Sequence, residues 1–135
     1  MKYKTGFTAS TFDLLHPGHL IMLKEAKSQC EHLIVGLLTD PTISRPDGKN
    51  KPVESTYERY VRLDACEYVD EIIPFDTEED LENMLYVLMP EVRFVGEEYK
   101  DKNHTGKNIE GIQIIYNKRR HSFSSTNTRE KINGN

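Results

Sequence analysis

The chain has 135 residues, 36% of them hydrophobic and 30% charged, which suits one globular domain and excludes a disordered chain. Its formal net charge of -4 provides no broad basic field, so we expect no nucleic-acid partner. The two cysteines, Cys30 and Cys66, form no disulfide framework, and no apolar run approaches a membrane span or a signal core, so we expect a cytoplasmic protein with no membrane partner.

The first half of the chain alternates apolar and turn-forming segments. Residues 3–9 predict a strand, and residues 18–29 predict a helix that turns Leu23 and Ala26 toward the core. The continuous apolar run at 32–38 is typical of a strand buried on both faces of a parallel sheet. A long loop rich in Pro, Gly, Asp and Ser follows, and its end, ESTYER, supplies capping residues for a helix that runs to about Cys66.

The second half continues the alternation. Its predicted elements are a strand over 68–75, a helix over 77–89 capped by Thr77 and ended by Pro90, strands over 91–96 and 111–117 around a polar loop, and a final short helix capped by residues 124–126. This order predicts an α/β class fold: a Rossmann-like, doubly wound, mostly parallel five-stranded sheet with helices on both faces, in a single domain over 1–135. Ligands bind beyond the carboxyl ends of such strands, where loops 10–19, 39–56 and 117–126 would meet.

Two histidines, His16 and His19, flank Pro17 and Gly18 in the stretch TFDLLHPGH, residues 11–19. Pro suits the first turn of a helix, and Gly lets a ligand approach the backbone closely. Free N–H groups at a helix start favour an anion, and an imidazole can donate a hydrogen bond to a phosphate oxygen. A zinc site would need a third ligand, and the sequence has no HExxH pattern. The residues alone therefore favour a phosphate site, with a zinc site as the alternative.

Four stretches of the chain resemble the cytidylyltransferase family of the HxGH nucleotidyltransferase superfamily. TFDLLHPGH is similar to the family signature Gly-x-Phe-Asp-x-x-His-x-Gly-His. RRHSFSSTNTRE resembles the second signature, in which an Arg precedes Ile-Ser-Thr-Thr at a helix start. YVDEIIP and FVGEEY resemble two further family stretches. The resemblance covers almost the whole chain and is closest to the glycerol-3-phosphate cytidylyltransferases.

The resemblance implies an enzyme that transfers CMP from CTP to a phosphorylated alcohol, such as glycerol 3-phosphate, with release of pyrophosphate. Its partners would be CTP and the phosphorylated acceptor, Mg²⁺ would accompany the triphosphate, and the chain would form a homodimer. Two alternatives remain open: an adenylyltransferase that uses ATP, and a non-catalytic nucleotide-binding module of the same fold.

The resemblance also assigns site residues. His16 and His19 would contact the triphosphate and stabilise the pentavalent transition state, and Lys49 and Arg119 complete the catalytic set. Asp13 would orient its loop or help to place Mg²⁺, and no metal site built from protein ligands alone is expected. The nucleotide-binding set comprises Thr11, Phe12, Asp13, Pro17, Gly18, Lys51, Arg59, Gly96, Glu97, Ser124, Ser125 and Thr126.

Simpler roles are open to several of these residues. Lys49 and Lys51 could be solvated loop charges, Arg59 could form a surface salt bridge with Glu58 or with acids near Asp64, and residues 124–126 could only cap a helix. The sequence also departs from the family pattern, and these departures leave the acceptor open to other phosphorylated alcohols, such as sugar or amino-alcohol phosphates. The departures are Ser10 in place of the usual Gly, Glu67 where the glycerol-phosphate enzymes carry Arg, and the absence of Trp, which leaves Tyr99 and Phe123 as the aromatic candidates.

Overall fold

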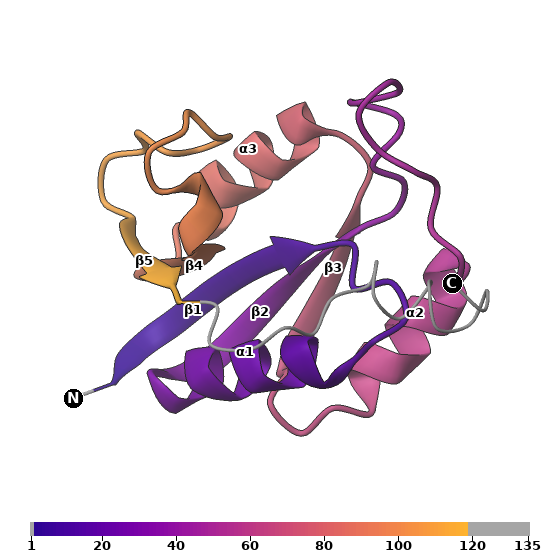
Figure 1. Cartoon of the computed structure of the whole chain (residues 1–135). Helices are drawn as coiled ribbons and strands as arrows, with labels where there is room; N and C mark the ends of the chain where they lie inside the picture. The colour runs from indigo at the N-terminus through magenta and orange to yellow at the C-terminus, as the bar shows by residue number, and fades with distance from the viewer. Residues whose placement is uncertain (1, 119–135) are drawn as a thin grey trace.

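Strands and helices alternate along residues 2–118, the part of the chain that our computed structural model describes (Figure 1). In chain order the elements are β1 (Tyr3–Ser10), α1 (Pro17–Ser28), β2 (Cys30–Leu38), α2 (Thr56–Asp64), β3 (Glu71–Phe75), α3 (Glu78–Leu88), β4 (Val92–Gly96), the 3-10 helix η1 (Glu97–Tyr99) and β5 (Gln113–Asn117). The final short helix, predicted to be capped by residues 124–126, lies outside the described residues.

The five strands form one sheet in the order β3-β2-β1-β4-β5, and each neighbouring pair is parallel. The predicted Rossmann-like α/β fold is therefore confirmed. The strand order reverses at β1, since the chain passes from β1 to β2 on one side and reaches β4 on the other. In open parallel sheets such a reversal opens a crevice at the carboxyl ends of the strands, which is where ligands bind.

Two predicted strands, β3 and β5, begin two or more residues later than their apolar patterns indicate. β3 starts at Glu71 rather than at residue 68, because the Val69 N–H bonds the Cys66 carbonyl in a turn and the Asp70 carboxylate accepts the Leu33 N–H. β5 starts at Gln113 rather than at residue 111, because Gly111 adopts a φ of +94° that a strand does not use.

Each face of the sheet carries its own hydrophobic cluster. Leu33, Val35 and Leu37 of β2 pack on the face covered by α1 and α2, together with Leu23 and Leu63. The opposite face, covered by α3, contains Phe7, Ile34, Phe75, Leu81, Leu85 and Ile109. The alternation along β2 follows from the two-residue period of a strand, and it confirms that helices cover both faces (Figure 1).

Side-chain caps fix where the helices begin. Thr77 accepts the Asp80 N–H at the start of α3, as predicted, and three acidic residues in the first turn complement the helix dipole. Ser55 and Glu58 form a reciprocal capping box at the start of α2. α3 ends at Leu88; its C-cap Met89 adopts the left-handed conformation, and Pro90 follows.

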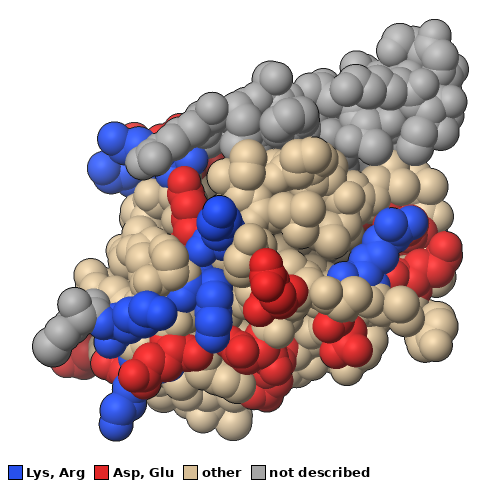
Figure 2. Space-filling view, turned by 90° about the horizontal axis from the view of Figure 1, so that it is seen from below, with Lys and Arg blue, Asp and Glu red and all other residues tan. Residues whose placement is uncertain are grey.

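Lys and Arg side chains lie between Asp and Glu side chains over the face seen from below in Figure 1 (Figure 2). The mixture gives this face no large field of one sign. Among the described residues no helix is long and apolar enough to cross a membrane.

Candidate active site

A cavity of about 720 Å³ opens at the carboxyl ends of β1 and β4, at the place where the strand order reverses. Three segments that are distant in sequence line it: the TFDLLHPGH loop, the loop between β2 and α2, and the segment after β4. The sequence predicts that the first two loops meet residues 117–126. The structure describes residues 117 and 118 of that segment, and these two residues line the cavity.

His16 and His19 form the first turn of α1, and each side chain bonds the backbone of the other. His16 is the N-cap, and its Nδ1 accepts the N–H groups of Gly18 at 3.0 Å and His19 at 3.4 Å. The His19 Nδ1 accepts the His16 N–H at 3.2 Å, and the two rings stack with centroids 3.8 Å apart. Because both Nδ1 atoms accept, the neutral rings carry their proton on Nε2, the N–H that a phosphate oxygen would accept from. Pro17 follows at N1, as predicted.

Phe12 and Leu14 give the motif loop its tight path, since both adopt the left-handed conformation with φ of 52° and 51°. Such a conformation costs about 1–2 kcal/mol for a residue with a side chain, so neighbouring contacts must hold it. The Phe12 ring has no exposed surface and lies edge-on to His19, with centroids 5.4 Å apart. We therefore assign the ring to supporting His19. Phe12 also lines the cavity, and its predicted contact with a nucleotide stays a prediction.

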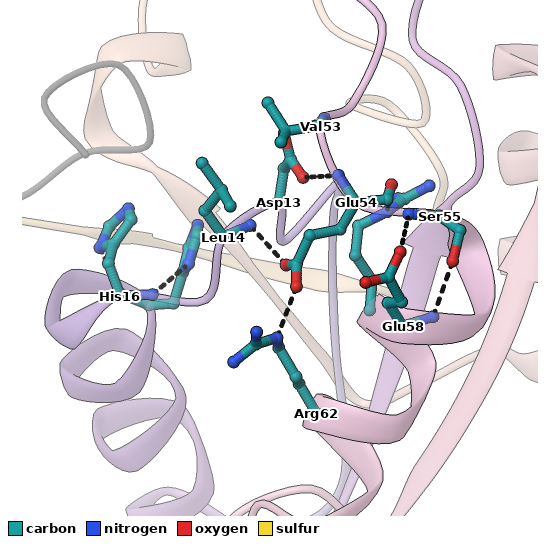
Figure 3. A network of polar contacts seen from close by, with 10 residues as sticks. Asp13, Leu14, His16, Val53, Glu54, Ser55, Glu58 and Arg62 are labelled. Carbon is teal, nitrogen blue, oxygen red and sulfur yellow. Dashed lines mark hydrogen bonds and ion pairs between the residues drawn. The ribbon is translucent and has the colours of Figure 1, made fainter. Parts of the chain in front are cut away.

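Asp13 and Glu54 clasp the motif loop to the loop that precedes α2 (Figure 3). The two carboxylate oxygens of Asp13 accept the N–H groups of Val53 at 2.8 Å and Glu54 at 3.0 Å. The Glu54 carboxylate accepts the Leu14 N–H at 2.9 Å and the Arg62 Nε–H at 2.6 Å. We call this reciprocal pair the Asp13–Glu54 clasp. It agrees with the prediction that Asp13 orients its loop.

Arg59 lies beneath the clasp with an exposed fraction of 1%. Its five N–H donors bond five protein oxygens: the carbonyls of Thr11, Leu38, Thr39 and Glu54, and the Thr56 hydroxyl. A guanidinium has five donors, so none is left for a phosphate. Neither predicted role fits this geometry: the guanidinium is not placed to bind nucleotide, and it forms no surface salt bridge. Arg59 instead ties the ends of β1 and β2 to α2.

The remaining predicted residues divide between the cavity wall and its surroundings. Thr11, Gly18, Lys49 and Gly96 line the cavity, as does Ser10. Lys51 is exposed and lies 3.7 Å from the Asp40 carboxylate, and Glu98, not Glu97, lines the wall. Glu67 is exposed and precedes β3, at the end of the sheet opposite the cavity. Arg119, Phe123, Ser124, Ser125 and Thr126 lie outside the described residues.

A second wall of the cavity lies on the α3 face of the sheet, and Tyr99, named above as an aromatic candidate, is its one predicted member. Arg93 of β4, Glu78 at the start of α3, and His104 and Thr105 of the segment after η1 line it, together with Tyr99. Burial lowers the pKa of His104, and the Arg93 charge adds to that effect, so this ring is neutral at pH 7. For the other members the one available signal was Arg93, a charge inside an otherwise apolar strand.

The zinc alternative finds no support among residues 2–118, where no three His, Cys, Asp or Glu side chains gather as a metal site would require. The Nδ1 atoms of both motif histidines are also occupied by backbone N–H groups.

Residues 7–131 match the model of the cytidylyltransferase-like family. The bifunctional protein HldE of Paramagnetospirillum magneticum is 36% identical over 98% of this chain, and that of Caulobacter vibrioides is 34% identical over 96%. The chain spans 28% and 27% of the lengths of these two relatives.

Two solved structures share the fold. The lipopolysaccharide core biosynthesis protein of Thermoplasma volcanium superposes with a TM-score of 0.68 and 25% identity, over 90% of this chain and 99% of that one. A pantoate-beta-alanine ligase of Francisella tularensis, in complex with beta-gamma ATP and beta-alanine, has a TM-score of 0.60 over 94% of this chain and 65% of its own. At 18% identity, the ligase shows the fold alone.

Proposed function

This chain belongs to the cytidylyltransferase-like family of nucleotidyltransferases, and we propose that it transfers a nucleoside monophosphate from a triphosphate to the phosphate of a phosphorylated sugar. The observation that carries the proposal is the capping box of His16 and His19, which presents two imidazoles and a helix N-terminus at the cavity. The likeness of this chain to the lipopolysaccharide core biosynthesis protein of Thermoplasma volcanium is our reason for proposing a sugar acceptor rather than glycerol 3-phosphate.

In the proposed reaction an acceptor phosphate oxygen attacks the α-phosphorus of the triphosphate. A new P–O bond forms, the bond between the α-phosphorus and its bridging oxygen breaks, and pyrophosphate leaves with that electron pair. The protein needs no nucleophile, because positioning and charge stabilisation supply most of the catalysis in phosphoryl transfer. The Nε2–H groups of His16 and His19 would donate to the triphosphate, and Lys49 on the cavity wall would add positive charge.

Mg²⁺ is part of the proposal as a partner of the triphosphate. The Asp13 oxygens each bond a backbone N–H and no cluster of three carboxylates, cysteines or histidines lies among residues 2–118. This suits an ion held by phosphate oxygens and water more than one held in a protein cage. When bound, the ion neutralises phosphate charge. The homodimer implied by the resemblance stays a prediction, which light scattering would measure.

The base of the nucleotide has two candidates. The resemblance to cytidylyltransferases favours CTP, whereas the two relatives above are HldE proteins and carry no cytidylyltransferase name, so ATP is the second candidate. We would measure pyrophosphate release with each of four nucleoside triphosphates against a panel of sugar 1-phosphates and glycerol 3-phosphate. Nucleotide binding without turnover for every pair would favour the non-catalytic module instead.

His16→Asn separates the two roles of this residue. Asn is as good an N-cap as any residue, so α1 should keep its start, and the variant should unfold within about 0.5 kcal/mol of the wild type. Loss of the imidazole donor should lower turnover by roughly 100-fold or more. His16→Ala should lose turnover and also about 1 kcal/mol of cap stability. The matched control is His32→Asn, because His32 is half-buried on β2, contacts Glu71 and lies outside the cavity wall. Full turnover in His16→Asn would refute the assignment.

A further inference from the structure

Arg93 is a charged residue inside β4, yet its exposed fraction is 7%. Its neighbours Val92 and Phe94 pack in the cluster under α1 and α2, so Arg93 points to the other face, toward α3. Burying a guanidinium is costly unless hydrogen bonds replace the water that it loses. The partners of its donors therefore indicate whether this charge has a structural role.

Among the described residues Arg93 has one hydrogen-bond partner, since Nη1 donates to the Thr105 carbonyl. The carboxylate that acts on its charge belongs to Glu78, but no ion pair joins the two within 4.0 Å. Glu78 is engaged elsewhere, because it accepts the Thr105 hydroxyl at 2.8 Å and lies 3.6 Å from Arg45. Four of the five Arg93 donors thus have no partner within residues 2–118.

The contrast with Arg59 is informative, because that arginine is also buried and uses all five donors. Arg59 is absent from the cavity wall, whereas Arg93 lines it. A buried arginine that serves only the fold bonds protein oxygens, as Arg59 does. An arginine with unmet donors on a cavity wall has the chemistry of an oxyanion receptor, since its planar fork matches carboxylate and phosphate.

The backbone of the segment after η1 lies close to this arginine at Gly106. Gly106 adopts a φ of +75°, and a Cβ at this position would lie 2.9 Å from the Arg93 Nη1 and 2.6 Å from the Leu85 Cδ1. Only glycine therefore permits this approach without displacement. His104, held by the Tyr116 hydroxyl at 3.1 Å, lines the same wall.

We propose that Arg93 binds a second anionic group of the acceptor, distinct from the phosphate that attacks the nucleotide. The acceptor class is then a phosphorylated sugar acid or a sugar bisphosphate, with its reactive phosphate on the His16 side of the sheet edge and its second anion on the α3 side. That the bound molecule is the acceptor rests on the proposed function, whereas the binding of an anion rests on the geometry of Arg93.

Arginine side-chain ¹⁵N NMR of the full chain tests anion binding without requiring turnover. The probes are 3-phosphoglycerate and glycerol 3-phosphate, which differ by a carboxylate in place of a hydroxymethyl group, and fructose 1,6-bisphosphate and fructose 6-phosphate. We expect the Arg93 resonance, assigned by its loss in Arg93→Lys, to shift with 3-phosphoglycerate or fructose 1,6-bisphosphate and not with the matched probes, which carry a single anionic group. The Arg59 resonance is the internal control and should not move.

Calorimetry supplies the second measurement. Arg93→Gln should weaken binding of the preferred probe with two anionic groups at least tenfold and that of its partner with one anionic group less than twofold, while Lys24→Gln, an exposed charge on α1, should change neither. A thermal melt checks that Arg93→Gln is folded, and the Arg93 resonance of the wild type remains decisive if it is not. An Arg93 signal that ignores every probe overturns the inference, even if pyrophosphate release supports the function. An Arg93 shift without turnover for any pair instead rejects the proposed function.

Discussion

Replacing Glu54 by Ala removes one half of the Asp13–Glu54 clasp and should destabilise the chain by about 2–3 kcal/mol. Glu54 is 7% exposed, and its carboxylate is the acceptor for the Leu14 N–H. Leu14 adopts a left-handed conformation that the side chain itself disfavours, so this bond holds a strained turn.

The magnitude follows from two separate losses. An N–H left without a partner in a partly buried site costs about 1–3 kcal/mol. The ion pair with Arg62 adds about 0–1 kcal/mol, because the Arg62 side chain is 56% exposed and its charge is well solvated. The first loss therefore dominates. Glu54→Gln should lose only about 1 kcal/mol, since its amide oxygen can still accept the Leu14 N–H, and Arg62→Ala should lose less than about 1 kcal/mol.

Urea unfolding of the full chain at pH 7 would measure all three variants, with pyrophosphate release as the parallel assay. We expect the order Glu54→Ala, Glu54→Gln, Arg62→Ala, from most to least destabilised, and the lowest turnover in Glu54→Ala. If Arg62→Ala were as damaging as Glu54→Ala, the surface ion pair and not the Leu14 bond would be the important contact. A loss below about 0.5 kcal/mol in Glu54→Ala would refute the clasp as a source of stability.

Three further changes test other contacts. Asp13→Asn replaces one acceptor oxygen by an NH₂ group that opposes a backbone N–H, so urea unfolding should show a loss of about 1–3 kcal/mol. Burial by itself would raise the pKa of Asp70, but the bonds from Lys27 and the Leu33 N–H outweigh it and hold the pKa below its ordinary value of 3.8. As the pH falls, the unfolded chain therefore takes up the proton first. The ionised Asp70 contributes about 1 kcal/mol to the free energy of unfolding, which is present above pH 4 and is lost as the pH falls through the lowered pKa. In Asp70→Asn the free energy of unfolding should depend less steeply on pH below 4, and an unchanged slope would contradict this. Gly106→Ala places a methyl group against two side chains at a positive φ and should lower stability by about 1–3 kcal/mol in a thermal melt, whereas a wild-type Tm would show that the segment relaxes freely.

The fold could be predicted because its strongest signals are local and periodic. The apolar run at 32–38 predicts a buried strand of a parallel sheet, and the apolar stripe over 77–89 predicts a helix that covers the sheet. The structure confirms both as β2 and α3. The errors lie at the predicted strand starts, residues 68 and 111, where a turn hydrogen bond or a positive φ delays the beginning of strand pairing. Neither feature has an apolar pattern that a sequence could show.

The site could be predicted only where residues are close in sequence. The capping box of His16 and His19 is a contact over three residues, so the motif contained it. The roles of Arg59 and Arg93 depend on partners such as Thr11, Leu38 and Thr105, which tertiary folding brings to them. The sequence does not give the donor partners of either arginine, and only a count of donors and acceptors in space separates a structural guanidinium from one with unmet donors.

That separation places two tasks on opposite faces of one sheet. The TFDLLHPGH loop and the clasp belong to the α1 and α2 face, and they hold the two imidazoles at the cavity. Arg93 and the segment after η1 belong to the α3 face and share with the motif only the cavity and the strands between them. Changes in residues 97–112 can therefore alter which acceptor fits without disturbing the groups proposed to act on the nucleotide. On this basis a chain can keep an intact nucleotidyltransferase motif while its acceptor differs from that of glycerol-3-phosphate enzymes, and Arg93 is the residue at which that difference would be measured first.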